Sequence, residues 1–329
     1  MRIPGIKKVK TFSRWLHARI VGGALILGYH RVGTVLHDDY DVCVTPEHFA
    51  DQMQVLSKFA QPIPLSKLVR CLKENSVPPR SVAVTFDDGY ADNLYQVKPV
   101  LEKYQVPATV FVCTGYTGKE FWWDELDRMV TSSTADLASL RLEIANHLFL
   151  WNRPAQSIEV NLDVRRKLGR DLYNFLLRLD VDEQVQALQS IRNWSGVSPG
   201  EGTTRGMNCE ELQQLVRGGL IQLGAHTRHH PVLPWLSPER QREEIAASKQ
   251  DLESWLGVRV DGFAYPNGMA TDETKNIVRD EGFVYACTSL QDVVRPASDL
   301  HLLTRFWQKD VDGDRFVRGL RLWLKGGES

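Results

Sequence analysis

Short runs of β-branched and other apolar residues alternate along this chain with segments whose apolar residues recur at helical spacing. This alternation predicts parallel strands joined by helical crossovers, as in an α/β sheet or barrel. The predicted strands are Ala24–Tyr29, Val82–Phe86, Ala108–Cys113, Leu220–Ala225, Gly262–Tyr265, Val284–Thr288 and Leu302–Phe306. The predicted helices include Pro46–Phe59, Tyr90–Tyr104, Cys209–Gly218, Pro238–Leu256 and Asp272–Glu281.

One long stretch interrupts this rhythm. From about Phe121 to Thr204 the sequence is polar and helical in pattern, shows no strand signal, and separates two strands that otherwise belong together. We expect a helical insertion over one mouth of a barrel that comprises residues 21–310. At roughly 150 residues per domain the length would suggest two domains, but a single α/β barrel with an insertion also fits 329 residues.

The composition changes this picture little. Hydrophobic residues make up 43% and charged residues 25%, which is ordinary for a globular protein. A net charge of −1 argues against nucleic-acid binding, which needs a basic surface. The five cysteines are odd in number and form no CxxC pair, so we expect buried, reduced thiols in a cytoplasmic protein.

The two ends of the chain are basic and amphipathic. Residues 1–37 carry seven Lys and Arg and no acid, and Arg315 to Lys325 carries four more. We interpret 1–20 as a basic amphipathic segment and 311–329 as a basic helix, and such ends can lie on the inner face of an anionic membrane. The alternative is that they are solvated helix ends packed on the barrel.

The apolar run Ile20 to Leu27 is too short to span a membrane, and Gly28-Tyr29-His30-Arg31 follows it instead of a cleavage site. We therefore interpret this run as a strand.

Two adjacent carboxylates end one predicted strand, in the segment Thr85-Phe86-Asp87-Asp88-Gly89. Catalytic groups of α/β barrels lie at the carboxyl ends of strands, and two carboxylates repel each other there unless a cation lies between them. One could then bind a metal while the other acts as a base. An Asp-Gly turn with a helix N-cap is the structural alternative.

Histidines follow another predicted strand, in the segment His226-Thr-Arg-His229-His230-Pro231. The four-residue spacing of His226 and His230 would place both imidazoles on one side of a helical turn. Two imidazoles and one carboxylate form a three-ligand zinc site with a position open for water. His229 competes with His230 as the second histidine ligand, but its three-residue spacing from His226 directs its side chain elsewhere.

A third segment, Pro266-Asn267-Gly268, is a turn that can present a backbone N–H to an oxyanion.

Together these three segments resemble the polysaccharide deacetylase family, carbohydrate esterase family 4. The resemblance rests on TFDDG at Thr85–Gly89, HTRHHP at His226–Pro231 and FAYPNG at Phe263–Gly268, and it extends from about Ile26 to Phe306. It implies a distorted (β/α) barrel of about seven parallel strands. It also implies metal-dependent removal of N-acetyl groups from amino sugars, with Zn²⁺ the expected metal and Co²⁺ or Ni²⁺ as alternatives.

The resemblance assigns a role to each matching residue. Asp87 matches the catalytic base, and the backbone N–H of Asn267 faces the oxyanion. The metal ligands are matched by Asp88, His226 and His230.

The chain departs from the family pattern twice. Many members carry an arginine at the position of Ala264, where it pairs with the base, and we expect Arg305 to replace it. The late Leu-His-Asp segment that supplies the acid histidine is absent here, and His301 precedes its strand. His30 ends the first predicted strand, as in a branch of the family with an N-terminal Tyr-His strand, so we expect His30 to be the general acid. The alternative is a buried histidine that bonds a neighbouring loop.

Aromatic residues near the predicted strand ends suit contacts with a sugar. Trp122 and Trp123 open the insertion, and Tyr265 lies in the third motif; we expect these three to bind substrate. Packing of the insertion is an equally good explanation for the tryptophans.

The leading hypothesis is thus a metal-dependent N-deacetylase that acts on an amino sugar of a polysaccharide or of its lipid-linked precursor. The alternatives are hydrolysis of another carbon–nitrogen amide bond on the same barrel, or an inactive module that binds glycans or a membrane. The sequence indicates no oligomeric state.

Overall fold

The computed structural model describes the chain except for residues 1–22, 35–41, 134–138, 154–161, 199–203 and 325–329. The chain divides into two compact units: Met1–Thr117 with Met207–Ser329, and Gly118–Gly206. The predicted amphipathic segment 1–20 lies outside the described residues. None of the helices in the described ranges has the length and apolar character needed to cross a membrane.

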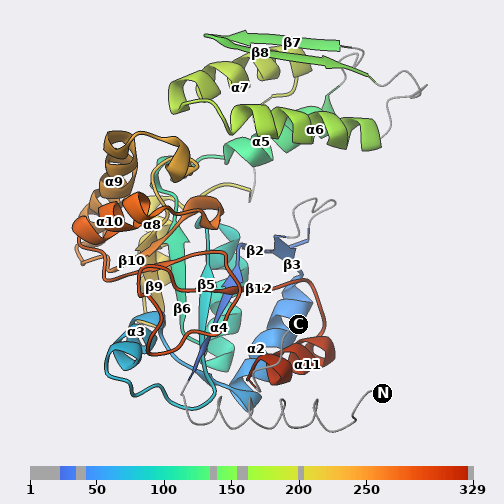
Figure 1. Cartoon of the computed structure of the whole chain (residues 1–329). Helices are drawn as coiled ribbons and strands as arrows, with labels where there is room; N and C mark the ends of the chain where they lie inside the picture. Colours follow the sequence, from blue (N-terminus) through green and yellow to red (C-terminus); the bar gives the residue numbers. More distant parts are fainter. Residues whose placement is uncertain (1–22, 35–41, 134–138, 154–161, 199–203, 325–329) are drawn as a thin grey trace, which may run out of the picture. The chain divides into compact units, whose positions relative to one another are not determined.

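A parallel sheet forms the centre of the first unit (Figure 1). Its strands follow the order β11-β10-β9-β6-β5-β1-β12, and β4 pairs with the start of β5. These strands are β1 (Leu25–Tyr29), β4 (Gln61–Pro62), β5 (Ser81–Phe86), β6 (Ala108–Val112), β9 (Ile221–Ala225), β10 (Gly262–Ala264), β11 (Tyr285–Cys287) and β12 (Phe306–Trp307).

The two ends of this sheet are linked by the segment that precedes β12. Cys287 of β11 forms a parallel bridge with Leu303, whose N–H donates to the Ala286 carbonyl at 2.9 Å. The sheet is therefore the predicted distorted (β/α) barrel of seven parallel strands. The last strand was predicted at Leu302–Phe306 but spans Phe306–Trp307, because the chain first bonds to β11 and pairs with β1 only from Phe306 onward.

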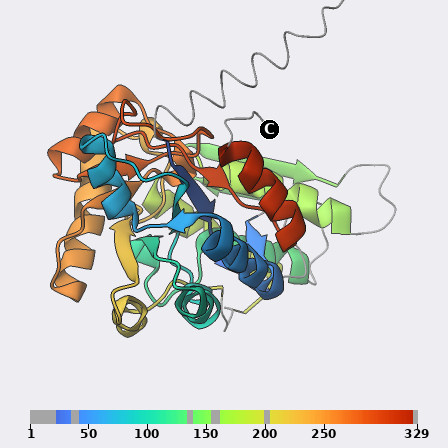
Figure 2. The same cartoon turned by 90° about the horizontal axis from the view of Figure 1, so that it is seen from below.

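Helices surround the outside of the barrel (Figure 2). They begin and end close to the predicted bounds where the sequence has clear caps. For example, Ser237 caps α9, Pro238 occupies its first turn, and Gly257 ends it in the left-handed conformation. The helices are α2 (Pro46–Phe59), α3 (Leu65–Lys73), α4 (Lys98–Tyr104), α8 (Cys209–Val216), α9 (Pro238–Leu256), α10 (Asp272–Asp280) and α11 (Gly313–Leu324).

Shorter elements complete the first unit. The predicted helix Tyr90–Tyr104 begins later, with the π-helical turn η1 (Asn93–Val97) that leads into α4. Two two-residue strands pair in parallel, β2 (Arg31–Val32) and β3 (Cys43–Val44). The 3₁₀ turns are η2 (Thr114–Tyr116), η3 (Leu233–Trp235) and η4 (Pro266–Gly268).

Every residue of strands β1, β5 and β6 is buried. Strands of a parallel sheet that is covered by helices are buried on both faces, which explains why their sequences are continuous apolar runs. The carboxyl ends of these parallel strands meet at one edge of the barrel, and Asp87 and His226 directly follow β5 and β9.

In the part that the structure describes, the second unit contains three helices and one hairpin. Its elements are α5 (Trp122–Ser132), β7 (Ser139–Ile144), β8 (His147–Asn152), α6 (Leu162–Leu176) and α7 (Val181–Ser195). The predicted insertion is present, but the prediction that it lacks strands was wrong. The sequence SLRLEI of β7 alternates exposed and buried residues, which is the period of a strand with one buried face.

Candidate active site

Two successive carboxylates leave strand β5 in different conformations. The Asp87 N–H donates to the Tyr29 carbonyl at 2.9 Å and so continues the pairing with β1. Asp88 and Gly89 then adopt positive φ angles of 69° and 83°, which turn the chain sharply. A Cβ at Gly89 would lie 3.1 Å from a methyl group of Val112, a tight contact that adds to the preference for glycine at this positive φ.

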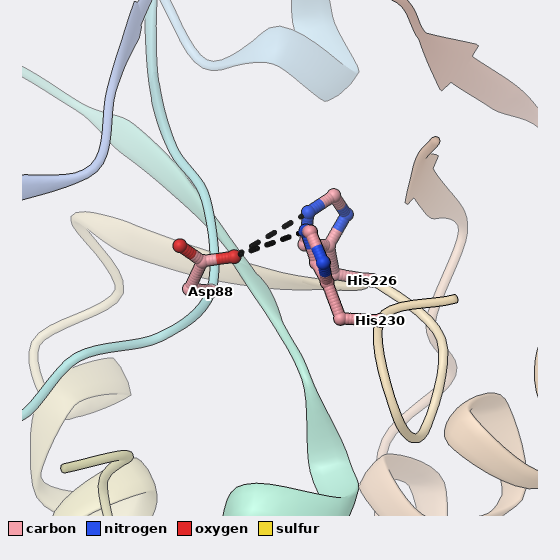
Figure 3. A group of neighbouring side chains, drawn as sticks. All are labelled: Asp88, His226 and His230. Carbon is pink, nitrogen blue, oxygen red and sulfur yellow. Dashed lines mark ion pairs between the residues drawn. The ribbon is translucent and has the colours of Figure 1, made fainter. Parts of the chain in front are cut away.

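The two predicted histidine ligands meet Asp88 at the same edge. The Nε2 atoms of His226 and His230 each lie 3.6 Å from Asp88 Oδ1 (Figure 3). The loop between the histidines is not the helical turn expected from their spacing. Positive φ angles at Thr227 (61°) and His230 (58°) bring the imidazoles together instead. The Thr227 hydroxyl stabilises this loop by accepting a hydrogen bond from the His230 N–H at 3.0 Å.

Glu244 of α9 holds the loop from the other side. One carboxylate oxygen accepts hydrogen bonds from the backbone N–H groups of Arg228 (3.0 Å) and His229 (2.8 Å). The other lies 2.7 Å from Nδ1 of His229. His229 is thus bonded to α9, which agrees with the prediction that His230 and not His229 faces the metal position.

The donor set and spacing of Asp88, His226 and His230 fit a divalent metal. One ligand atom from each residue lies within 4.8 Å of the others. Ligand atoms around a tetrahedral zinc ion are about 3.3 Å apart, close to the spacing of these side chains. His226 Nδ1 lies 2.8 Å from the Ala264 carbonyl, which leaves Nε2 as the ligand atom. Burial lowers the pKa of both imidazoles, so both are neutral as metal ligands must be.

Arg305 is fully buried and binds Asp87 through both terminal guanidinium nitrogens. Its Nη1 and Nη2 donate to the two carboxylate oxygens at 2.6 and 2.7 Å. Burial is the largest single cause and raises the pKa of Asp87. The charge and hydrogen bonds of Arg305, together with two neighbouring histidines, outweigh it, and the pKa falls to about 2. Asp87 is therefore ionised at neutral pH. The structure thus pairs Arg305 with Asp87 through two hydrogen bonds.

His30 follows β1 and lies in the same charge cluster. Its burial lowers its pKa to about 4, against the opposing effect of Asp87. The Asn93 side chain donates to the His30 carbonyl at 3.0 Å, and the imidazole stacks on the Trp307 ring with centroids 4.6 Å apart. His30 is therefore a neutral imidazole that stacks on Trp307 and interacts electrostatically with Asp87.

The third motif forms a turn after β10. Asn267 has a positive φ of 56° within η4, and the Gly268 N–H donates to the Tyr265 carbonyl at 2.8 Å. A Cβ at Gly268 would lie 2.1 Å from the Ser289 hydroxyl, so glycine is required where the turn meets the chain beyond β11.

Two of the predicted substrate-binding side chains are buried instead. Tyr265 is completely enclosed in the barrel and donates its hydroxyl hydrogen to the His301 carbonyl at 2.9 Å. Trp122 is 2% exposed and stacks on Tyr173 inside the second unit. Their large apolar surfaces pack the interior, which corrects the prediction for both. Trp123 is half-buried and stacks on Phe121, and its contact with substrate stays a prediction.

Three residues with contacts to this site were missed in the sequence. Trp307 lies two positions after Arg305, and that spacing in an extended segment could have indicated a shared face. Glu244 and Asn93 lie on helical elements that are distant in sequence from the residues to which they bond. No local sequence pattern indicates such contacts.

Comparison with known proteins finds one family model and several named relatives that this chain resembles. The family model described as polysaccharide deacetylase matches residues 74–156 and 195–286. The chain is 32% identical over 111 residues to a poly-beta-1,6-N-acetyl-D-glucosamine N-deacetylase of Staphylococcus aureus strain MSSA476. It is also 32% identical over 108 residues to the protein of that name from Staphylococcus epidermidis. These matches cover 30% and 29% of this chain, and 38% and 37% of the relatives.

Solved structures show the same fold over almost the whole chain. The Streptococcus pyogenes deacetylase PplD, in complex with acetate, aligns with a TM-score of 0.60 at 18% identity and covers 91% of this chain and 99% of its own. IcaB from Ammonifex degensii aligns with a TM-score of 0.58 at 21% identity and covers 92% and 97%.

Proposed function

Because the chain belongs to the polysaccharide deacetylase family, whose model matches more than half of its residues, we propose that it is a metal-dependent hydrolase that removes N-acetyl groups from an amino sugar of a polysaccharide. The observation that carries this proposal is the metal-binding set of Asp88, His226 and His230 beside the ionised Asp87. The intact set argues against an inactive glycan-binding module.

The residues divide the chemistry between them. Asp88, His226 and His230 would hold a divalent ion, with zinc the first choice for two imidazoles and one carboxylate. A zinc ion in such a site lowers the pKa of a water molecule to about 7 and polarises the acetyl carbonyl. Asp87 accepts the proton of the attacking water, and the backbone N–H of Asn267 stabilises the oxyanion that develops on the acetyl oxygen.

His30 protonates the amine that leaves. Its imidazole is neutral in the resting site, so the proton that it donates must reach it during turnover. Asp87 and His30 influence each other's pKa. In this proposal the proton that Asp87 takes from the water passes to His30, which then donates it to the leaving amine.

Relatives support the choice of substrate. The staphylococcal proteins that match 30% of this chain are named for poly-beta-1,6-N-acetyl-D-glucosamine. We therefore propose a polymer of N-acetylglucosamine, or its lipid-linked precursor, as the substrate, and a role in exopolysaccharide synthesis.

The basic face of α11 supports contact with an anionic membrane as a second property of the chain. Arg315, Arg318 and Arg321 are exposed on this helix, and Leu322 is 54% exposed beside them. Such a surface suits the inner face of a bacterial membrane, where a cytoplasmic enzyme would meet a lipid-linked sugar.

Acetate release from β-1,6-linked N-acetylglucosamine oligomers tests the deacetylase activity. Chelator-stripped protein should be inactive and should regain activity with zinc or cobalt. Asp87→Asn should bind zinc at full stoichiometry but release no acetate, because the base is lost and the ligands remain. Asp88→Asn is the matched variant, and it should lose both zinc binding and activity. Full activity of Asp87→Asn would contradict the mechanism, and failure of the wild-type protein to release acetate would contradict the substrate.

A further inference from the structure

The Trp307 ring packs against β1 at Gly28, where a larger residue would collide with it. Trp307 of β12 is the register partner of Gly28 in β1. A Cβ at Gly28 would lie 2.8 Å from Cε3 and 2.9 Å from Cζ3 of the indole. Both atoms belong to the six-membered ring, so the backbone of Gly28 lies directly against the indole.

The same ring contacts two residues of the catalytic cluster. The His30 imidazole stacks on it with an interplanar angle of 18° and centroids 4.6 Å apart. The guanidinium carbon of Arg305 lies 4.7 Å from the indole centroid, which is a cation–π contact. Arg305 in turn holds both oxygens of Asp87. Trp307 is therefore a common neighbour of the proposed acid and of the arginine that holds the proposed base.

We propose that Trp307 is a positioning residue that fixes the His30 imidazole and the Arg305–Asp87 pair relative to each other, and that Gly28 is required to admit its ring. This inference rests on the proposed deacetylase function for its catalytic consequence. Asn93 holds only the main-chain carbonyl of His30, so it leaves rotation of the imidazole free. The indole face restricts that rotation.

The shape of the side chain decides the expected effects. Trp307→Leu removes the aromatic face, while Trp307→Phe keeps a smaller one that can still stack on an imidazole and accept a cation. Misplacement of a catalytic group by about 1 Å can cost about 100-fold in rate. We therefore expect kcat to fall about 100-fold in Trp307→Leu, with little change in KM. Trp307→Phe should recover most of this loss.

Trp255 provides a matched control. It is also a half-buried tryptophan, but it lies near the end of α9 and packs against the core. Trp255→Leu should lower the thermal stability by an amount similar to Trp307→Leu while kcat stays within twofold of the wild type. Zinc stoichiometry should be unchanged in every variant, because the three ligands are untouched.

Nuclear magnetic resonance of His30 gives a readout that does not depend on turnover. Ring protons above an indole face are shielded, so the His30 signals should lie upfield in the wild-type protein. They should move downfield in Trp307→Leu and only slightly in Trp307→Phe. A His30→Gln variant identifies the signals.

Gly28→Ala tests the fit of the ring from the opposite side. In the wild-type background the new Cβ should displace the indole, lower kcat and move the His30 signals as Trp307→Leu does. In the Trp307→Leu background the same change should cost almost nothing more, because the colliding ring is absent. This non-additivity is the signature of a direct contact.

The outcomes separate the inference from the proposed function. If the wild-type protein releases acetate but Trp307→Leu keeps its kcat and its His30 signals, the positioning role is wrong and the function stands. If the wild-type protein releases no acetate from any oligomer while the His30 signals respond as described, the function is wrong and Trp307 still orients the cluster. Equal losses of kcat in Trp255→Leu and Trp307→Leu, with unmoved His30 signals, would show a merely structural role.

Discussion

Arg305 is completely buried, and its guanidinium forms hydrogen bonds with three residues at the proposed catalytic edge. Its Nε donates to the Thr288 carbonyl at 3.1 Å, its Nη1 also reaches the Thr85 hydroxyl at 3.2 Å, and both Nη atoms bind Asp87. A buried ion pair of this kind holds its carboxylate ionised and in one orientation. Arg305 thus links the end of β11, strand β5 and the proposed base Asp87.

Replacing Arg305 by Met should strongly destabilise the protein, because Asp87 would remain buried without its cation. Loss of one partner of a buried pair typically costs 3–5 kcal/mol, so we expect the free energy of unfolding at neutral pH to fall by about that amount. Urea unfolding measures it. The double variant Asp87→Asn/Arg305→Met should recover part of the loss, since it leaves no buried charge at this position.

The single variant Arg305→Met should also reverse the way in which Asp87 makes the free energy of unfolding depend on pH. In the wild-type protein the folded pKa of Asp87, about 2, lies below its ordinary value of 3.8. Its contribution to stability is therefore complete above pH 3.8 and is lost as the pH falls toward 2. Without Arg305 burial raises the pKa, so the Asp87 contribution would decrease as the pH rises. A stability deficit that is equal at about pH 4 and about pH 7 would contradict this.

The contact between Arg305 and Asp87 shows how far sequence reasoning reaches for single residues. The Asp and His segments are local patterns, so their chemistry could be predicted from spacing and strand context. Arg305 lies 218 positions from Asp87 and could only be suggested as a replacement for an absent partner. Trp307 was missed because its effect depends on Gly28 of a neighbouring strand, and no pattern within either strand shows that pairing.

At the scale of elements, the loop His226–His230 after β9 is held by hydrogen bonds to α9, a helix that contributes no proposed metal ligand. The four-residue spacing of His226 and His230 predicted a helical turn, but the structure has a loop with two residues at positive φ. Glu244 of α9 compensates by accepting two backbone hydrogen bonds from this loop. Local spacing cannot predict such a loop, because the stabilising group comes from another element.

Glu244→Gln should therefore weaken metal binding without removing a ligand. Residues that orient ligands typically contribute 10–100-fold in metal affinity, and we expect zinc affinity to fall by about that factor. Competition with a chromophoric zinc chelator measures it. Glu243→Gln is the matched control, since Glu243 is exposed and pairs with Arg240 on the surface. Equal zinc affinity of the two variants would contradict a role of Glu244 in holding the loop.

Continuous apolar runs and clear caps explain why most barrel elements could be predicted. The hairpin β7–β8 was missed because the surrounding polar and helical pattern masked six alternating residues. The short strand β12 was misplaced because Leu303 bonds to β11 before the chain reaches β1. Hydrophobic period indicates burial, but it does not indicate which strand is the partner.

At the scale of the whole molecule, the charge is unevenly distributed although the net charge is −1. The exposed arginines of α11 concentrate positive charge on one helix. On its neighbour α2, Phe59 is 41% exposed and lies under the Arg321 guanidinium at 5.4 Å. A surface with cations beside exposed apolar side chains is the kind that binds anionic lipid headgroups.

Sedimentation with lipid vesicles tests this surface. The protein should pellet with vesicles that contain phosphatidylglycerol and not with phosphatidylcholine vesicles, and added salt should weaken binding. The double variant Arg318→Glu/Arg321→Glu should bind much less, since each basic residue near an anionic surface contributes about 1 kcal/mol. Acetate release from soluble oligomers should be unchanged. Vesicle binding that is independent of salt concentration and of lipid charge would contradict the proposal.

The second unit is continuous in sequence, and its two ends lie next to each other. Glu120 and Arg205 form an antiparallel backbone β-bridge, and the Gly206 N–H donates to the Lys119 carbonyl at 2.9 Å. The chain thus leaves and re-enters the barrel at almost one point, which is the geometry of an exchangeable cassette. Protein engineers could replace Gly118–Gly206 with a short linker, or with the corresponding segment of another member of the family, and keep every proposed metal ligand.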